Sequence, residues 1–322
     1  MAKQEKKLEF RYYNIPAGEY VLPKLGDGWV QQYGVGYEDT MHFHNYMEIG
    51  YFYYGKGELF IEDRTYPYSG DDPMFSVIPA NIPHNTITVP GRVDHWEFLF
   101  IDIDSFIREE MKGDRFDVDE VIRIVNKRGT LKTKANHPAL DRIIQSIIGE
   151  YRKEGLYYKE SVKGYLKAFV IELLRLDEER GRVQRSSAHT AYLSAAITYI
   201  EEHYAEDFRV SDLANVCGLS ESHFRRVFED SMNMKPADFV NLIRIQHGCR
   251  LIENEHLSME EVGYRVGYTT PSTFNRNFKR ITGKTPYQWK SEAKKRTSTL
   301  AELNISALKG WEALDTGYGF TE

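Results

Sequence analysis

The sequence has 322 residues, enough for two or three domains, and its 41% hydrophobic and 28% charged residues are typical of an ordinary soluble protein. The net charge of −6 argues against a general polyanion binder, and because no apolar run approaches a membrane span, we expect no membrane partner. The charged start lacks the apolar core of a signal peptide, and two cysteines, Cys217 and Cys249, are too few for a disulfide scaffold, which favours the cytoplasm.

Residues 8–110 are rich in Tyr, Phe, Gly and Pro and predict short strands and turns. The clearest predicted strand is His42–Tyr54, whose odd positions are mainly apolar. Its even positions include His42, His44, Tyr46 and Glu48, which therefore share one face. Further strands are expected near Glu58–Glu62, Met74–Ile78 and Val93–Ile103. Many short strands without intervening helices favour a β-barrel or jelly roll, assigned to residues 1–135.

Spaced glycines, histidines and an acid in this region resemble the motifs of cupin barrels. The first cupin motif is matched at every spacing by Gly36, His42, His44, Glu48 and Gly55. The second is resembled by Gly70, Pro79 and His84, with Asn81 and Thr88 departing from it. The resemblance implies a cupin-like barrel.

Three roles are open for the polar residues of these motifs. In enzymatic cupins the matching residues, His42, His44, Glu48 and His84, would bind a metal, and such a set suits Fe, Mn or Zn. Alternatively, these side chains and Tyr46 line a polar cavity and hydrogen-bond a small-molecule effector. They can also be structural histidines near a barrel rim.

Aromatic residues are concentrated early in the chain. They include Tyr12, Tyr13, Trp29, Tyr33, Tyr37 and Tyr46. Aromatic walls with a few polar groups suit a sugar or an aromatic acid, although any single tyrosine is more often plain core or surface.

Helical periodicity begins after the irregular residues 111–135, for which we expect one strand or short helix. Apolar residues form one stripe over Pro138–Arg152 and another over Val162–Leu176. Joined at Gly155, these helices make a hairpin, assigned to residues 136–180. The hairpin either covers the barrel or forms a homodimer contact, and we favour the dimer.

Residues 181–190 lack an apolar pattern and read as an interdomain linker. A helical domain is assigned to residues 191–296. In the tail, residues 297–322, the apolar residues Leu300, Leu303, Leu308, Trp311 and Leu314 predict a weak amphipathic helix of unknown role.

A helix, a tight glycine turn and a second helix are predicted in Ser258–Lys290. Ser258 is a helix N-cap, and Gly267 takes the left-handed conformation that ends the helix. Thr269 or Thr270 caps the next helix, in which Phe274, Phe278 and Ile281 form one apolar stripe.

Residues Ser211–Ser231 repeat this pattern. Ala214, Gly218, Phe224 and Phe228 correspond to Gly263, Gly267, Phe274 and Phe278, and Ser211 and Ser220 are the expected caps. Between the copies, Pro236–Ile252 predicts a stiff helix with Phe239, Leu242, Ile243, Cys249 and Ile252 on one side. Two helix-turn-helix units held about one DNA turn apart, roughly 34 Å, would reach adjacent major grooves.

These residues resemble a known family. Leu193–Lys290 is similar to the double helix-turn-helix domain of AraC/XylS-type transcription regulators, whose sensory domains are often cupin-like. Gly248 and Gly263 stand where the family usually has Ala, and such a glycine costs a helix up to about 1 kcal/mol. The resemblance implies double-stranded DNA as a partner. It also favours effector contacts over metal binding, so no cofactor is expected.

The charge of this domain is not that of a basic DNA binder. Leu193–Lys290 carries 12 Lys and Arg against 13 Asp and Glu, whereas Val262–Lys290 has no acidic residue. Positive charge is therefore local, and one-signed charge suits phosphate contacts, although most charge runs are simply solvated.

The resemblance assigns base reading to Ser222, Arg225, Arg226, Pro271, Ser272, Thr273 and Arg276. Arginine holds guanine through two hydrogen bonds, so Arg226 and Arg276 are favoured. Lys279, Arg280 and Lys284 are assigned to phosphates. Arg225 can instead pair with Glu221 or Glu229, one helical turn away.

The sequence thus predicts an α+β multidomain protein, with an N-terminal cupin-like barrel, a helical hairpin and a C-terminal all-α double helix-turn-helix domain. We expect a transcription regulator that responds to a small molecule, possibly a sugar, and is not an enzyme. The alternatives are a metal-dependent cupin enzyme, and a DNA-binding protein whose barrel is only a dimerisation scaffold.

Overall fold

The computed structural model describes residues 7–15, 18–34, 40–62, 64–70, 72–112, 117–181, 188–232, 234–254, 257–296, 303–306 and 310–313. The chain forms two compact units. We call Gly18–Glu38 with Tyr46–Ser186 the sheet unit, and Met1–Ala17, Asp39–Asn45 and Ser187–Glu322 the helical unit. No helix in the described part of the chain is long and apolar enough to cross a membrane.

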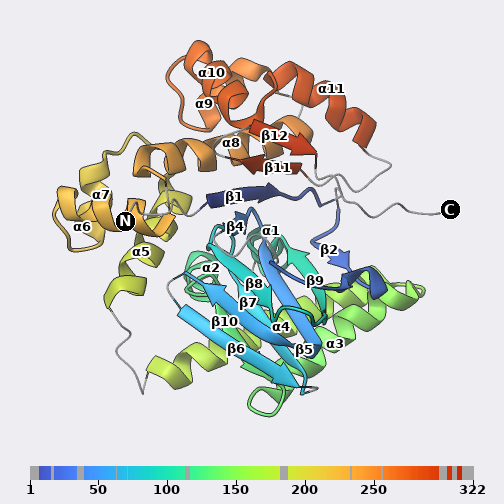
Figure 1. Cartoon of the computed structure of the whole chain (residues 1–322). Helices are drawn as coiled ribbons and strands as arrows, with labels where there is room; N and C mark the ends of the chain where they lie inside the picture. The colour runs from blue at the N-terminus through green and yellow to red at the C-terminus, as the bar shows by residue number, and fades with distance from the viewer. Residues whose placement is uncertain are drawn as a thin grey trace. The chain divides into compact units, whose positions relative to one another are not determined.

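Strand β5 (Met47–Ile61) organises the sheet unit because it belongs to two sheets (Figure 1). Its first half pairs with β7 (Met74–Ile78) and β9 (Asp94–Ile101). Its second half pairs with β6 (Arg64–Gly70) and β8 (His84–Thr88). Strands β2 (Val21–Lys24) and β3 (Val30–Gln31) pair with β9, and β10 (Thr130–Thr133) pairs with β7. The predicted N-terminal barrel is confirmed as a half-barrel.

The change of sheet occurs near Gly55, at a bulge in β5. The register with β9 shifts between Phe52 and Tyr54, and Gly55 has a φ of 135°. A Cβ at Gly55 would collide with the side chain of Asp94. A glycine is needed here because a strand that turns a barrel corner brings another chain segment close to its backbone.

Four helices pack against the sheet and form the hydrophobic core of the sheet unit with it. They are α1 (Ile103–Glu110), α2 (Val118–Val125), α3 (Pro138–Lys153) and α4 (Tyr158–Gly181). Figure 1 shows α3 and α4 as adjacent green helices beside the sheet. Strand residues such as Ile49, Val77 and Leu99 share one buried cluster with helix residues such as Ile144 and Phe169. The predicted helical hairpin is therefore present, and its apolar stripes cover the sheet.

Two expectations for the strand region need correction. The predicted strand His42–Tyr54 is two strands, β4 (Thr40–His44) and β5, separated at Asn45 and Tyr46. Asn45 ends β4 because its side-chain amide bonds both the N–H and the C=O of Tyr13, at 2.8 and 3.0 Å. Residues 111–135, expected to hold one short element, contain both α2 and β10.

The helical unit contains seven helices among its described residues. They are α5 (Ala188–His203), α6 (Val210–Val216), α7 (Glu221–Met232), α8 (Pro236–Asn254), α9 (Met259–Arg265), α10 (Pro271–Thr282) and α11 (Pro286–Arg296). Since α5 begins at Ala188, it overlaps the range 181–190 that reads as a linker. Pairs α6–α7 and α9–α10 are the two expected helix-turn-helix units, and the expected joining helix is α8.

Most local signals in these helices are confirmed. Ser258 and Thr270 are N-caps, and Gly218 and Gly267 have φ values of 66° and 86°. Ser220 caps α7, accepting from the N–H of His223 at 3.4 Å.

The expected cap Ser211 is wrong. The N-cap of α6 is Arg209, whose N–H donates to the Asp212 carboxylate at 2.7 Å. Ser211 therefore lies inside the helix, and the acid three residues beyond the cap accepts the N–H of the N-cap residue, as the acid of a capping box does.

The predicted aromatic stripes form the core of the helical unit. Phe228 of α7 packs against Phe239 at the start of α8, with ring centroids 5.5 Å apart. Phe274 of α10 lies against the two unusual glycines: a Cβ would stand 3.3 Å from its ring at Gly248 and 3.1 Å from it at Gly263. Both glycines thus make room for this ring. The cysteines Cys217 and Cys249 are buried and form no disulfide bond.

Strands from both ends of the chain join the helices of this unit. β1 (Lys7–Tyr12) pairs with β4 and with β11 (Leu303–Ser306), which pairs with β12 (Gly310–Ala313). The amphipathic helix predicted for the tail is therefore wrong where the tail is described. The remaining tail residues lie outside the described ranges.

Candidate functional site

Helix α10 presents the strongest candidate surface. Phe274 and Phe278 are buried, whereas Arg276, Lys279 and Arg280 on the other side are exposed. No described residue hydrogen-bonds or ion-pairs with the side chains of Arg276 and Lys279. An aromatic stripe thus anchors the helix while its cationic face stays available.

Other predicted residues of α10 are more engaged. The Thr273 hydroxyl lies 2.9 Å from that of the N-cap Thr270, and Arg280 bonds Asp238 of α8 and Asn277 at 3.2 and 3.1 Å. Pro271 occupies the first turn, and Ser272 is exposed. Lys284 lies just beyond the helix and is half-buried. Arg280 therefore has to break its ion pair with the exposed Asp238 before it can bind a phosphate.

The corresponding helix α7 differs in its charge. Arg225 donates to Glu221 from Nε and Nη2 at 3.0 and 2.7 Å, which is the intrahelical pairing that the sequence allows. Arg226 and Ser222 are exposed, and within the described residues Arg226 has no such partner. Of the two arginines, Arg226 is the one free to reach a base.

Strand β4 brings His42 and His44 together within the helical unit. Both side chains are buried, and their ring centroids are 6.2 Å apart. Between them, Phe43 points to the opposite face and packs against Phe239 of α8 at 6.1 Å. The same strand therefore carries candidate effector contacts and a contact with the helix that joins the two helix-turn-helix units.

In the sheet unit, Glu48 and His84 form a second buried pair. His84 Nε2 lies 3.6 Å from Glu48 Oε2, and both residues are at most 5% exposed. The other ring nitrogen, Nδ1, is 2.8 Å from the Ile82 carbonyl and must carry the proton, because a carbonyl only accepts. Metal-bound histidines often show this pattern, so the pair suits either a metal or a hydrogen-bonded effector. Tyr46 is also buried.

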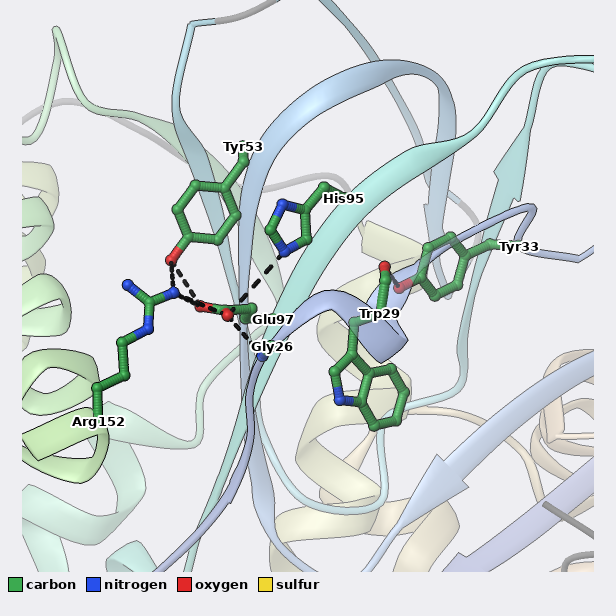
Figure 2. Close-up of polar contacts among 7 residues, drawn as sticks. All are labelled: Gly26, Trp29, Tyr33, Tyr53, His95, Glu97 and Arg152. Atoms are coloured by element: carbon green, nitrogen blue, oxygen red, sulfur yellow. Dashed lines mark hydrogen bonds and ion pairs between the residues drawn. The ribbon is translucent and has the colours of Figure 1, made fainter. Parts of the chain in front are cut away.

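Sequence reasoning missed a buried carboxylate, Glu97 on β9 (Figure 2). Arg152 at the end of α3 donates to both of its oxygens at 2.8 and 2.7 Å, the Tyr53 hydroxyl donates at 2.6 Å and the Gly26 N–H at 2.7 Å. Burial alone would raise the pKa of Glu97, but these hydrogen bonds outweigh it, and the pKa is lowered. Glu97 therefore stays ionised and ties β9 to α3 and to the turn at Gly26.

The segment that follows the turn carries two of the early aromatic residues. Trp29 and Tyr33 pack edge-on against Phe98, with centroids 5.3 and 6.2 Å away, and the Tyr33 hydroxyl donates to the Trp29 carbonyl at 2.6 Å. Phe98 is the strand neighbour of Glu97, so its side chain lies on the opposite face of β9. In the sequence, the signal for the Glu97 hydrogen-bond network was an acid inside an otherwise apolar strand pattern.

Asp94 forms another network that the sequence did not reveal. Its carboxylate accepts from the Lys56 N–H at 2.8 Å, from the Thr88 hydroxyl at 2.7 Å and from the Tyr68 hydroxyl. Burial and the Asp94 charge raise the pKa of Tyr68, which keeps its proton. Asp94 is fully buried, and its bonds hold the corner of the half-barrel.

Comparison with known proteins follows this division of the chain. A family model described as an AraC-like ligand binding domain matches residues 32–170, and one described as a helix-turn-helix domain matches residues 213–292. The Msm operon regulatory protein of Streptococcus mutans is 24% identical over 293 residues, which are 89% of this chain and 96% of that protein. The probable transcriptional regulator LumQ of Photobacterium leiognathi is 24% identical over 250 residues, 78% of this chain and 91% of that protein.

A solved structure, the DNA-binding domain of AdpA in complex with a target DNA, is 26% identical and covers 33% of this chain and 96% of that one. Its TM-score is 0.32, too low to establish a common overall fold.

Proposed function

Because the chain belongs to the AraC-type transcriptional regulators, with a ligand-binding domain and a DNA-binding helix-turn-helix domain, we propose that α7 and α10 read DNA bases under the control of a small molecule. The family is one of regulators rather than enzymes, and its members give the cupin-enzyme alternative no support. We further propose that the protein works in the cytoplasm.

The observation that carries this proposal is the cationic face of α10. Arg276 is proposed to hold a guanine, aided by Ser272, Thr273 and Pro271 in the first turn, while Lys279, Arg280 and Lys284 contact phosphates. In α7 the proposed readers are Ser222, Arg225 and Arg226. Phosphate contacts position the protein, and the arginines supply the discrimination between bases.

Selection of duplexes from a random-sequence pool by the full-length protein tests this proposal. Two recognition helices on one protein predict enriched sequences with two conserved blocks, about 10 base pairs apart from centre to centre. A pool that shows no enrichment after repeated rounds would refute it.

The candidate effector contacts are those that the sequence indicates, and each unit carries its own group of them. His42 and His44 come from β4, and Tyr46, Glu48 and His84 come from the sheet unit. Ionisable side chains that offer both donors and acceptors suit a polar molecule such as a sugar. Thermal-shift screening against sugars and small organic acids tests this, and a midpoint rise that is lost in Glu48→Gln supports it. A broad panel without any stabilising compound would favour a barrel that serves only as a scaffold.

Strand β4 offers the route by which an effector reaches the DNA-binding helices. An effector held by His42 and His44 would fix β4, and Phe43 would then fix the start of α8 through Phe239. Such a switch needs an effector that binds one arrangement better than the other. Phe43→Ala should leave the thermal shift by the effector in place but abolish its effect on DNA affinity.

A homodimer is also proposed, through the tip of the α3–α4 hairpin. Leu156 and Tyr157 at this tip are 87% and 73% exposed, whereas most residues of the two apolar stripes are buried in the core of the sheet unit and the others are partly buried. Exposed large apolar side chains mark candidate contact surfaces. Light scattering should give twice the chain mass for the wild type and one chain mass for Leu156→Glu.

A further inference from the structure

Helix α8 joins the two helix-turn-helix units, α6–α7 and α9–α10 (Figure 1). A joining helix limits the distance between the units, but the few residues at each of its ends can act as hinges. Contacts beside the helix are therefore needed to fix the angle between α7 and α10. The structure shows such contacts where three segments of the helical unit meet: the turn after α5, the middle of α8 and the turn between α9 and α10.

Arg244, near the middle of α8, is bonded to the turn after α5. Its Nε donates to the Tyr204 carbonyl at 2.7 Å, and its Nη2 donates to the Glu206 carbonyl at 2.8 Å. Burial lowers the pKa of Arg244, but a guanidinium stays protonated in proteins, so both hydrogen bonds are charge-assisted. The ring of His247, about one turn further along α8, stacks on that of Tyr204 with centroids 3.8 Å apart. Helix α8 thus holds the segment that leads into α6 and the first helix-turn-helix unit.

The same guanidinium also contacts the second helix-turn-helix unit. Its central carbon lies 5.6 Å from the centre of the ring of Tyr268, which stands in the turn between α9 and α10. A guanidinium within about 6 Å of a tyrosine ring is attracted to the negative face of that ring. The Tyr268 hydroxyl donates to Asn241 of α8 at 3.0 Å, and its ring packs against Phe274 of α10 at 5.6 Å. Tyr268 therefore links Arg244 to the second recognition helix.

The turn glycines of the two helix-turn-helix units differ in what surrounds them. A Cβ at Gly267 would stand 2.8 Å from the Ala205 carbonyl oxygen, whereas a Cβ at Gly218 would meet nothing within 4 Å. Both glycines have a positive φ, so each provides the left-handed conformation of its turn. Of the two, Gly267 also lets the backbone of the second unit approach the turn after α5.

We propose that Arg244 is a positioning residue for DNA recognition, which fixes the angle between α7 and α10 by tying the turn after α5 to Tyr268. The inference rests on the proposed reading of bases by these two helices. Each base pair added between two binding blocks turns one block relative to the other by about 34°. A pair of helices held at one angle therefore favours one spacing of the blocks, and a loosened pair tolerates several.

Anisotropy titrations of the full-length protein test this with three duplexes. The two selected blocks stand at their selected spacing, one base pair closer or one base pair further apart. The measured quantity is the spacing ratio, which is the affinity for the selected spacing divided by the affinity for an altered one. A general loss of stability weakens binding to all three duplexes alike and leaves this ratio unchanged. The ratio therefore separates positioning from a merely structural role.

Variants of Arg244 give the first expectation. Arg244→Met keeps a long side chain but has no donor for the two carbonyls. It should lower the spacing ratio by at least about threefold, within the range by which mutations outside a binding site change the coupling between sites. Arg244→Lys keeps the charge and reaches one of the two carbonyls, so its ratio should lie between those of the wild type and Arg244→Met.

The two turn glycines provide a matched pair of variants. Alanine at either position is strained by the positive φ, but only at position 267 does the new Cβ press on Ala205. Gly267→Ala should therefore lower the spacing ratio, and Gly218→Ala should leave it unchanged.

An unchanged spacing ratio in both Arg244→Met and Gly267→Ala would overturn the inference, as would an equal fall in the two glycine variants. The glycine pair decides even if Arg244→Met fails to fold. Equal affinity of the wild type for all three spacings would also contradict the inference, while its preference for the selected sequence would still support the proposed function. A wild type without any sequence preference would instead refute the proposed reading of DNA itself.

Discussion

The two helix-turn-helix units share one backbone plan but differ in charge and packing. In α7, Glu221 holds Arg225, and two further acids, Glu229 and Asp230, follow in the same helix. In α10 no acid is present, and Arg276 stays available. The two units thus share a scaffold but present different recognition surfaces. We infer that the second unit supplies more of the affinity and of the base discrimination.

The largest expected effect concerns the packing of the second unit. Phe274→Ala removes a fully buried ring that packs against Gly248, Gly263 and Tyr268, and should cost about 3–5 kcal/mol of unfolding free energy. Urea denaturation of the full-length protein measures it. Phe224→Ala, the same change in α7, is the matched comparison. A loss below about 1 kcal/mol in Phe274→Ala would mean that α10 does not depend on this ring.

Base reading by Arg276 should give the next largest effect. Arg276→Ala should reduce discrimination at one or two base pairs by about 1–3 kcal/mol, because a bidentate contact to guanine is lost. Anisotropy titrations with selected duplexes and their single-base variants measure it.

Lys279→Ala is the control for Arg276, since both residues are exposed cations of α10. It should weaken all duplexes alike and reduce the salt slope by about 1. If both variants weakened every duplex to the same extent, Arg276 would be a phosphate contact.

A substitution at Gly263, one of the two glycines around Phe274, should change the free energy of unfolding by up to about 1 kcal/mol. Gly263→Ala should destabilise the wild type, because the new Cβ would lie 3.1 Å from the ring. In a Phe274→Leu background, which offers more space, the same change should stabilise α9 by up to about 1 kcal/mol through helix propensity. Stabilisation of equal size in both backgrounds would show that Phe274 does not exclude a side chain at position 263.

The smallest expected effect concerns α7, in the first helix-turn-helix unit. Glu221→Gln removes an exposed ion pair that contributes about 0.3–0.5 kcal/mol, and it releases Arg225. DNA affinity should rise about twofold, with little change in stability. Glu201→Gln in α5 removes an acid outside the recognition helices and serves as control. Weaker DNA binding in Glu221→Gln would mean that the pair positions Arg225 for DNA.

Local signals were enough to predict the helix-turn-helix helices of the helical unit from the sequence. Caps such as Ser258 and Thr270, the glycine at 267 and the aromatic stripes act within one or two helical turns, so neighbouring residues decide them. The pairing of Arg225 with Glu221 was foreseen as an alternative for the same reason. The cap of α6 was missed because its N-cap, Arg209, is not a usual capping residue, and the helix start is marked by Asp212, which accepts the Arg209 N–H.

Long-range contacts could not be predicted in the same way. Glu97 meets Arg152 and Gly26 through tertiary structure, and nothing near it in sequence indicates these partners. Asn45 ends a strand by bonding to Tyr13, far along the chain. The cupin-like spacing singled out His42, His44, Glu48 and His84, which the structure shows to be buried, but it did not show that Phe43 packs on α8.

One cycle of measurements tests most directly how DNA recognition is divided between the two helix-turn-helix units. Wild type and Arg276→Ala would be titrated against a selected duplex and against duplexes with either conserved block scrambled. We expect Arg276→Ala to become nearly indifferent to one block while its sensitivity to the other is unchanged. Equal sensitivity of both proteins to both blocks would contradict it.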